Sequence, residues 1–315
     1  MITTLTLNPS FDRTVVVGGG VRLGEVHVVD SSSVEAAGKG VNVALSIARN
    51  GGASAAVLAA DGADAAAFDD RLTSDGAATR IVPRGTPVRT NLSLIDAHGV
   101  TTKLNERGGE VGADTVDALL HAVVEREDGP ASVAACGSIP PGVPEDVYAQ
   151  LSARLADPAS SLAVDTSGAA LAAMRGVPCA LAKPNLHELH DLTGRSMSTL
   201  GDVVDAARPL IESGWTSMLV SLGPDGALLI DEDTVVHGRP LDVTVRNTAG
   251  AGDALLAGFL FAGGRGTPAL AEGLAWARAA IAAPSTVADR ISDAARTAVD
   301  VDEAPDLGTR LEEAT

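Results

Sequence analysis

The feature that most constrains the fold is an alternation of short apolar runs with longer, Ala-rich segments. Each run is apolar on both faces and ends in turn residues, which is typical of strands buried on both sides of a parallel sheet. The segments between the runs have helical spacing, and several begin near Asn, Asp or Ser. The alternation predicts a doubly wound, mostly parallel α/β sheet with helices on both faces, folded as a single domain over residues 1–315. The predicted strands are residues 2–7, 53–60, 131–136, 161–165, 179–183 and 217–221, and the predicted helices are residues 41–50, 64–76, 112–126, 144–156 and 199–213.

Three segments depart from this alternation. Residues 13–30 and 87–105 alternate polar with apolar side chains and carry turn signals at Gly18–Gly20 and His98–Gly99, so they predict antiparallel strands with one solvated face. We expect them to meet as a small β-sheet lid over a site at the carboxyl ends of the main strands. Residues 297–315 are acidic and poor in large apolar side chains, and we expect a loose tail there.

The charge balance excludes one class of partner. The chain has 41 acidic and 23 basic residues, a net charge of −18, so its field repels polyanions. Aromatic residues make up only 2% of the chain, which leaves few surfaces for base stacking. We therefore expect no nucleic-acid partner. Only three of the basic residues are lysines, and either adaptation to high salt or a codon bias towards arginine would explain that shortage.

The sequence also indicates the cellular compartment of the protein. The N-terminal residues contain no basic segment followed by a long apolar stretch, and no segment reaches the roughly 18 uninterrupted apolar residues of a membrane span. Cys136 and Cys179 lie in different apolar runs and form no metal-binding or CxxC spacing, so we expect buried thiols in a reducing environment. These features predict a cytoplasmic protein with no membrane partner.

The first motif with chemical content is NTAGAGD at residues 247–253, which precedes an apolar helical segment. Small residues before a helix let backbone N–H groups approach an anion, and the helix N-terminus adds partial positive charge. Asp253 at the start of such a helix has two interpretations. It stabilises the helix terminus as an ordinary first-turn acid, or it accepts a proton from a substrate hydroxyl that attacks a phosphoryl group.

The second motif is AGKGVNVA at residues 37–44, in which a lysine stands between glycines at the start of a helix. It lacks the GxxxxGK[ST] spacing of a Walker A loop. An ordinary Gly-rich loop is one interpretation. The other is an anion-binding site, favoured because Lys39 persists in a chain with so few lysines.

The other two lysines also lie in segments rich in turn residues. Lys103 is part of TKLNE at the end of the predicted lid, and Lys183 opens KPNLHE after an apolar run. In the latter motif, Asn185 and Glu188 have the spacing of a capping box. They equally suit a hydrated Mg²⁺ close to phosphates, since Mg²⁺ prefers oxygen ligands and keeps several waters.

Taken together, these motifs resemble the PfkB (ribokinase-like) carbohydrate kinases, and most closely the branch that phosphorylates fructose 1-phosphate and tagatose 6-phosphate. The resemblance covers the chain to about residue 285. The motifs that carry it, in order, are NPSFD at 8–12, AGKGVN at 37–42, TKLNE at 102–106, GSIPPG at 137–142, DTSG at 165–168, KPNLHE at 183–188, SLGPDGA at 221–227 and NTAGAGD at 247–253.

The resemblance implies a ribokinase-like fold with a β-sheet lid, often shared in a homodimer, and transfer of the ATP γ-phosphoryl group to a hydroxyl of a sugar phosphate with Mg²⁺. It also implies residue roles. Asp253 would be the general base, and Gly250, Ala251 and Gly252 would form the anion hole. The sugar hydroxyls would contact Asp12, Gly38 and Asn42, and the substrate's phosphate would contact Lys39, Arg89, Lys103 and Ser138. The nucleotide would contact Lys183, Asn185, Glu188, Ser221, Gly223, Gly226 and Thr248, and Glu188 would reach the metal through water.

Three positions depart from the family's pattern. Ala37 replaces a frequent Gly, Thr248-Ala249 replaces the commoner Ser/Thr-Val, and Arg107 stands where this branch usually has Pro. Arg107 adds a cation beside the lid and bears on which phosphate position is recognised. Phosphorylation of fructose 1-phosphate to fructose 1,6-bisphosphate is the leading hypothesis, tagatose-6-phosphate or fructose-6-phosphate kinase is the second, and a non-catalytic sugar-phosphate sensor is the alternative from another class.

Overall fold

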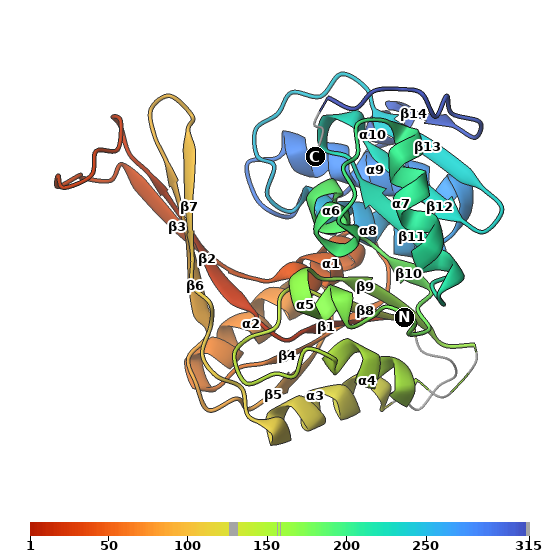
Figure 1. The fold of residues 1–315 in the computed structure, drawn as a ribbon. Coiled ribbons are helices and arrows are strands. Elements are labelled where there is room, and N and C mark those ends of the chain that lie inside the picture. Colours follow the sequence, from red (N-terminus) through yellow and green to blue (C-terminus); the bar gives the residue numbers. More distant parts are fainter. Residues whose placement is uncertain (126–131, 156, 158, 313–315) are drawn as a thin grey trace.

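The fold is built around one large β-sheet. The computed structural model describes residues 1–125, 132–155, 157 and 159–312. Its ten-stranded sheet has the order β14-β13-β12-β11-β10-β9-β8-β1-β4-β5 (Figure 1). Neighbours from β5 across to β11 run parallel, and β12, β13 and β14 add antiparallel strands at one edge, which confirms the predicted fold class. The strands are β1 (Ile2–Thr6), β4 (Ser54–Ala59), β5 (Ala78–Val82), β8 (Ser132–Cys136), β9 (Ser161–Asp165), β10 (Leu181–Ala182), β11 (Ser217–Ser221), β12 (Ala227–Asp231), β13 (Val235–Pro240) and β14 (Val299–Asp302).

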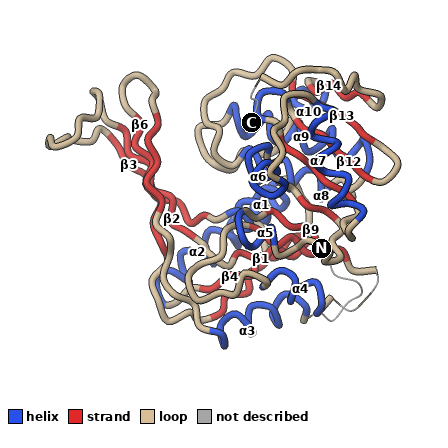
Figure 2. Tube along the Cα trace, in the orientation of Figure 1, coloured by secondary structure: helices blue, strands red, loops and turns tan. Residues whose placement is uncertain are grey.

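Helices cover both faces of this sheet (Figure 2). In β8, Val133 and Ala135 pack with α3 to α7, while Ala134 and Cys136 pack with α1 and α8 to α10, because successive side chains of a strand point to opposite faces. The described helices are α1 (Lys39–Arg49), α2 (Gly62–Ser74), α3 (Ala113–Val124), α4 (Val147–Arg154), α5 (Gly168–Ala172), α6 (Leu186–Thr193), α7 (Leu200–Glu212), α8 (Ala251–Phe261), α9 (Gly266–Ala282), α10 (Asp293–Thr297) and the 3₁₀ turn η1 (Gly223–Asp225). None of the helices described is both long and apolar enough to cross a membrane.

The predicted elements match the observed ones within a few residues, and the ends predicted at residues 126, 131 and 156 lie outside the described residues. The prediction omitted helices α5, α9 and α10, strand β5 and the antiparallel hairpin of β12 and β13. That hairpin turns at Asp231, whose carboxylate accepts hydrogen bonds from the backbone N–H groups of Asp233 and Thr234. The turn is built from acidic residues, which resemble an ordinary exposed loop in the sequence.

The two interrupting segments do meet in a second sheet, of four strands in the order β3-β2-β6-β7, which extends away from the main body (Figure 1). Its strands are β2 (Ser10–Val16), β3 (Ser31–Ala37), β6 (Arg89–Ile95) and β7 (Thr101–Asn105). The predicted boundaries need correction, because residues 18–30 contain no strand and β3 follows them. The Ser-rich start of β3 is exposed, so it lacks the alternation that marks a strand. The sheet is also mixed, since β2 pairs with β6 in parallel.

The expectation of a loose tail is wrong for residues 297–312. Strand β14 pairs with β13 at the edge of the main sheet. Leu311 is buried, and its N–H donates to the carbonyl of Ser198 at 3.0 Å. Backbone pairing at a sheet edge does not require an apolar segment, which is why composition failed here; residues 313–315 lie outside the described part.

The order of the strands in the sheet indicates where a ligand-binding crevice is expected. Strand β1 lies between β4 and β8, so the chain continues from β1 to one side and returns later to the other. Loops leaving the carboxyl ends of the strands diverge at such a switch point, which is where ligands bind in open α/β sheets.

Candidate active site

A cavity of about 390 Å³ lies where the carboxyl ends of the parallel strands approach the small sheet. It is lined from the ends of β9 and β11, the starts of α1, α6 and α8, and strands of the small sheet. The predicted site residues that line it are Asp12, Gly38, Lys39, Asn42, Lys103, Lys183, Asn185, Glu188, Ser221, Gly250, Gly252 and Asp253.

Asp253 lies in the first turn of α8 and is only 7% exposed. Gly250 caps this helix with φ 81°, and a Cβ there would lie 2.2 Å from the carbonyl oxygen of Thr286, so only glycine fits. The first amides of a helix have no intrahelical acceptor, so this terminus offers N–H donors to an anion. The Asp253 carboxylate accepts a hydrogen bond of 2.8 Å from Asn42 Nδ2.

The surroundings of Asp253 adjust its basicity. Burial and the negative charge of Asp165 raise its pKa from 3.8 to about 6, while Lys39, Asn42 and Lys183 oppose the rise. A carboxylate with this pKa remains mostly ionised at neutral pH and binds a proton more readily than an ordinary Asp. The group therefore has the properties of a general base.

The start of α1 brings a lysine to the same cavity. Its N-cap, Gly38, has φ 134°, and a Cβ there would lie 2.9 Å from Thr6 Cγ2 at the end of β1. A Cβ on Gly40 would lie 2.4 Å from Thr6 Oγ1. The glycines let the helix start pack directly on the strand end, and this packing places Lys39 at the cavity.

All three lysines of the chain line this one cavity. Lys39 Nζ lies 2.8 Å from Asp165 Oδ1, and Lys183 Nζ lies 3.1 Å from Asp165 Oδ2. Lys103 is exposed on β7. Asp165 is fully buried, and although burial raises its pKa, Lys183 and Lys39 bring it below the ordinary value.

The small sheet contributes a polar face to the cavity. Asp12 Oδ1 accepts hydrogen bonds from Ser10 Oγ at 2.7 Å and from Asn91 Nδ2 at 2.9 Å. Among the described residues, the buried side-chain oxygens of Asn91 and Asn42 have no hydrogen-bond partner. Because buried polar atoms are normally satisfied, these oxygens suit the hydroxyl groups of a ligand.

The capping-box interpretation of Asn185 and Glu188 is confirmed, and both residues also lie at the cavity. Asn185 Oδ1 accepts from the Glu188 N–H at 2.8 Å, and Glu188 Oε2 accepts from the Asn185 N–H at 2.9 Å, which completes a capping box. Within the described part of the chain, no group of three or more His, Cys, Asp or Glu residues is placed to hold a metal ion. A metal here would need ligands beyond the protein, such as phosphates and water.

Some predicted residues do not line this cavity. They are Arg89, Ser138, Gly223, Gly226, Thr248 and Ala251. Arg89 is half-buried, with Nη1 donating to the carbonyl of Glu106 at 2.8 Å, and Ser138 Oγ accepts from Asn8 Nδ2 at 3.2 Å. Gly226 is required by packing, because a Cβ there would lie 2.1 Å from the carbonyl oxygen of Gly238.

Conversely, the cavity contains residues to which the sequence analysis assigned no role. They are Ser10, Asn91, Asp165, Ala249 and Thr286. Ser10, Asp165 and Ala249 belong to motifs that carried the resemblance, so the motifs themselves were the available signal. Asn91 stands two residues after Arg89 on a strand and therefore on the same face, which was a usable signal. Thr286 had none.

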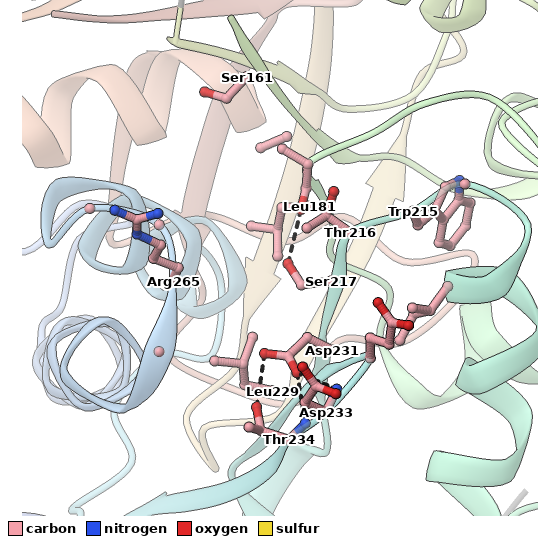
Figure 3. A pocket seen from close by; sticks show the side chains of 18 of the residues that line it. Ser161, Leu181, Trp215, Thr216, Ser217, Leu229, Asp231, Asp233, Thr234 and Arg265 are labelled. Carbon is pink, nitrogen blue, oxygen red and sulfur yellow. Dashed lines mark hydrogen bonds between the residues drawn. The ribbon is translucent and has the colours of Figure 1, made fainter. Parts of the chain in front are cut away.

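A larger cavity, of about 1070 Å³, lies at the amino ends of the parallel strands (Figure 3). It is lined by Ser161 and Ser217 at the starts of β9 and β11, by Asp231 and Thr234 of the β12–β13 turn, and by Arg265 before α9. No predicted site residue is part of its described lining. Size therefore does not identify the chemical site in this protein.

Comparisons with known proteins agree with this geometry. The model of the pfkB family of carbohydrate kinases matches residues 5–290. The 1-phosphofructokinase of Haloferax volcanii is 38% identical over 266 residues, which cover 83% of this chain and 84% of the relative. The ATP-dependent 6-phosphofructokinase isozyme 2 of Escherichia coli is 32% identical over 258 residues, covering 81% of this chain and 83% of that protein.

A solved structure shows the same architecture. Phosphofructokinase-2 from Escherichia coli in complex with substrates and products superposes with a TM-score of 0.86 at 29% identity, covering 94% of this chain and 97% of that one. The chain therefore belongs to the pfkB family of carbohydrate kinases.

Proposed function

We propose that this protein transfers the γ-phosphoryl group of ATP to fructose 1-phosphate and forms fructose 1,6-bisphosphate. The observation that carries the proposal is a buried carboxylate, Asp253, at a helix N-terminus in a cavity that also holds all three lysines. The choice of sugar phosphate is supported by 1-phosphofructokinases from five genera at 31–38% identity.

The proposed reaction uses Asp253 as general base. Its carboxylate takes the proton of the C6 hydroxyl while that oxygen forms a bond to the γ-phosphorus and the bond from the γ-phosphorus to the bridging oxygen of ADP breaks. Proton transfer of this kind contributes about 10²–10⁴-fold to a rate. The amides of Gly250, Ala251 and Gly252 would stabilise negative charge on the transferred group, since preorganised N–H donors need no rearrangement.

The remaining residues divide the cavity between two substrates. Sugar hydroxyls would contact Asp12, Gly38 and Asn42, and to these we add Asn91 because of its buried, unsatisfied oxygen. The phosphate already on the sugar would contact Lys39, Lys103, Arg89 and Ser138; the nucleotide would contact Lys183, Asn185, Glu188, Ser221, Gly223, Gly226 and Thr248.

The charges in the cavity suit a divalent cation. Three lysines face four carboxylates there, from Asp12, Asp165, Glu188 and Asp253, so these side chains alone offer no net positive charge to two anionic substrates. Glu188, whose carboxylate lines the cavity, would hold Mg²⁺ through water. When bound, Mg²⁺ would neutralise phosphate charge during transfer.

The small sheet would act as a lid and as a dimer interface. Its inner face places Asp12, Asn91 and Lys103 at the cavity. The register puts Val34 and Leu104 on the opposite face, where they are 55% and 56% exposed. Exposed apolar side chains of this kind are typical of an interaction surface, and a second copy of this sheet would cover them. A cytoplasmic location is part of the proposal, since both cysteines are free and buried.

The dimer has a direct test in light scattering coupled to gel filtration. Val34→Ser with Leu104→Ser should convert a dimer to a monomer, because the two changes remove apolar surface without affecting the core. Leu307→Ser, an exposed leucine elsewhere, is the matched control. A monomeric parent protein would refute the interface.

The substrate is tested by coupled ADP release with fructose 1-phosphate, fructose 6-phosphate and tagatose 6-phosphate. The highest kcat/KM is expected for fructose 1-phosphate, and no turnover of that sugar would overturn the proposal. The exposed side chain of Arg107 does not line the cavity, so nothing in its placement favours the 6-phosphates. Binding of a sugar phosphate without any ADP release would instead support the sensor alternative.

A further inference from the structure

Asp165 is the buried carboxylate at the end of β9, and the proposed transfer assigns it no contact with either substrate. It partners two lysines that come from different parts of the fold. We propose that Asp165 is a positioning residue that clamps Lys39 and Lys183 and thereby holds the sugar-phosphate half and the nucleotide half of the cavity in register. The inference rests on the proposed function for the identity of the two halves.

The geometry of the clamp joins three elements. Lys39 begins α1, Lys183 follows β10, and Asp165 ends β9. Each carboxylate oxygen takes one ammonium group, Oδ1 at 2.8 Å from Lys39 and Oδ2 at 3.1 Å from Lys183. An ammonium has three N–H donors, so each lysine keeps donors for a phosphate while the carboxylate fixes its direction.

An ion pair that served only folding would not need this arrangement. A buried charge is costly, and one lysine would suffice to neutralise a carboxylate. Here the carboxylate is fully buried, the Lys183 side chain is 4% exposed and the Lys39 side chain is 38% exposed towards the cavity. Two ammoniums on one carboxylate leave a net positive charge at the point where two phosphorylated substrates would meet.

The clamp also lies close to Asp253, the proposed general base. The titratable groups that act on Asp253 come from several elements: Asp165 on β9, Lys39 on α1, Lys183 after β10 and the Cys136 thiol on β8. The charge of Asp165 raises the pKa of Asp253, and the lysines lower it. A neutral Asp165→Asn change removes the raising charge and leaves both lysines, so the pKa of Asp253 should fall.

Amine acylation followed by mass spectrometry tests the clamp without any need for turnover. The chain has only three lysines, so each can be read separately. Burial lowers the pKa of Lys39, but Asp165, Asp253 and Glu188 outweigh it and raise that pKa above its ordinary value, which suppresses the reactive free amine. Asp165→Asn should lower the pKa of Lys39 and so raise its acylation rate relative to exposed Lys103. The rise should be about tenfold for each unit by which the pKa of Lys39 falls.

Kinetics of the same variant provide the second measurement. We expect kcat to fall about 10²-fold, because a small misplacement of positioning groups has this effect. KM should change for both ATP and the sugar phosphate, since the two lysines serve different halves. The acid limb of the kcat/KM profile should move to lower pH. An unchanged Lys39 to Lys103 ratio together with an unmoved acid limb would overturn the proposal.

Asp75→Asn is the matched control, because it removes a partly exposed carboxylate that pairs with Arg49 Nη2 at 2.8 Å and does not line the cavity. It should leave the acylation ratio and kcat unchanged. If Asp165→Asn does not fold, the change is made in a Lys183→Met background, which removes the lysine that would be left buried and unpaired. Lys39 acylation should then rise relative to Lys183→Met alone, and no rise would overturn the proposal.

The two hypotheses can fail separately. If the parent protein releases no ADP with any sugar phosphate while Asp165→Asn still increases Lys39 acylation, the proposed function is wrong and the clamp stands. If the parent turns over and Asp165→Asn changes neither acylation nor the pH profile, the clamp is wrong and the proposed function stands.

Discussion

The parallel strands of the main sheet end at one side, here called the carboxyl edge, and start at the other, the amino edge. The two sides differ in the charged groups that they carry. The carboxyl edge has the smaller cavity, about 390 Å³, with three lysines, four carboxylates and the start of α8. The amino edge has the larger one, about 1070 Å³, lined by Arg208, Arg265 and the acidic β12–β13 turn. Parallel strands all end at one edge, and the helices that follow begin there with free N–H donors. Groups that suit anionic ligands therefore gather at the carboxyl edge, whatever the cavity sizes are.

The strongest test of this contrast is Asp253→Asn, matched by Arg265→Gln at the amino edge. Loss of the base should lower kcat by about 10²–10⁴-fold and leave ATP binding largely intact. The Arg265 change should leave kcat unchanged. Steady-state ADP release with calorimetric ATP titration measures both, and full activity of Asp253→Asn would refute its role.

The same variant carries a stability prediction of defined sign. The folded-state pKa of Asp253 is raised to about 6, so ionisation of this group costs stability as pH rises from 3.8 to about 6. Above that range Asp253→Asn removes the cost. Denaturant unfolding at pH 8 should show a variant at least as stable as the parent, whereas a marked loss of stability would mean that the carboxylate serves the fold.

A second pair of changes compares one cation from each edge, Lys39→Met and Arg208→Met. Loss of a charge-assisted contact is worth about 1.5–3 kcal/mol, so KM for the sugar phosphate should rise about 10- to 100-fold in Lys39→Met. Arg208 donates to the carbonyl of Glu232 at 3.2 Å outside the site, and its loss should leave KM unchanged. Equal effects of the two changes would remove the distinction between the edges.

The pH dependence of the parent protein sharpens the assignment of the base. Because the pKa of Asp253 is about 6, kcat/KM should fall about tenfold per pH unit below that value and level off above it. The Asp75→Asn variant should give the same pH profile as the parent protein, and this comparison controls for the loss of a carboxylate elsewhere. A profile flat down to pH 5 would exclude a base of this pKa.

The smallest expected effect concerns the small sheet. Asn91→Ala removes the hydrogen bond to Asp12 and a polar atom facing the ligand, so KM for the sugar phosphate should rise about 5- to 10-fold. His98→Ala, at the exposed tip of the same hairpin, is the control. If KM for ATP rises instead, Asn91 lies on the nucleotide side and the proposed division of the cavity is wrong.

Much of the core architecture was predictable because local pattern carries it. Strands such as Ser132–Cys136 are buried on both faces and stand out as apolar runs. The elements that escaped prediction depend on pairing: Ser31–Ala37 begins as an exposed Ser-rich edge, and Val299–Asp302 lies in an acidic segment that joins the sheet through its backbone. Neither has an apolar pattern that a sequence could reveal.

The site divides in the same way. Short motifs predicted Asp253 and the three lysines, because a glycine-rich helix start and a lysine among glycines are local features. The clamp at Asp165 was not predictable, since it partners a lysine 126 residues away and its charge matters only after β9, β10 and α1 converge. Local sequence thus specified which groups are available, whereas the pKa of Asp253 and the convergence of the lysines arise from tertiary packing, because burial and charge pairing depend on distances that no local pattern contains.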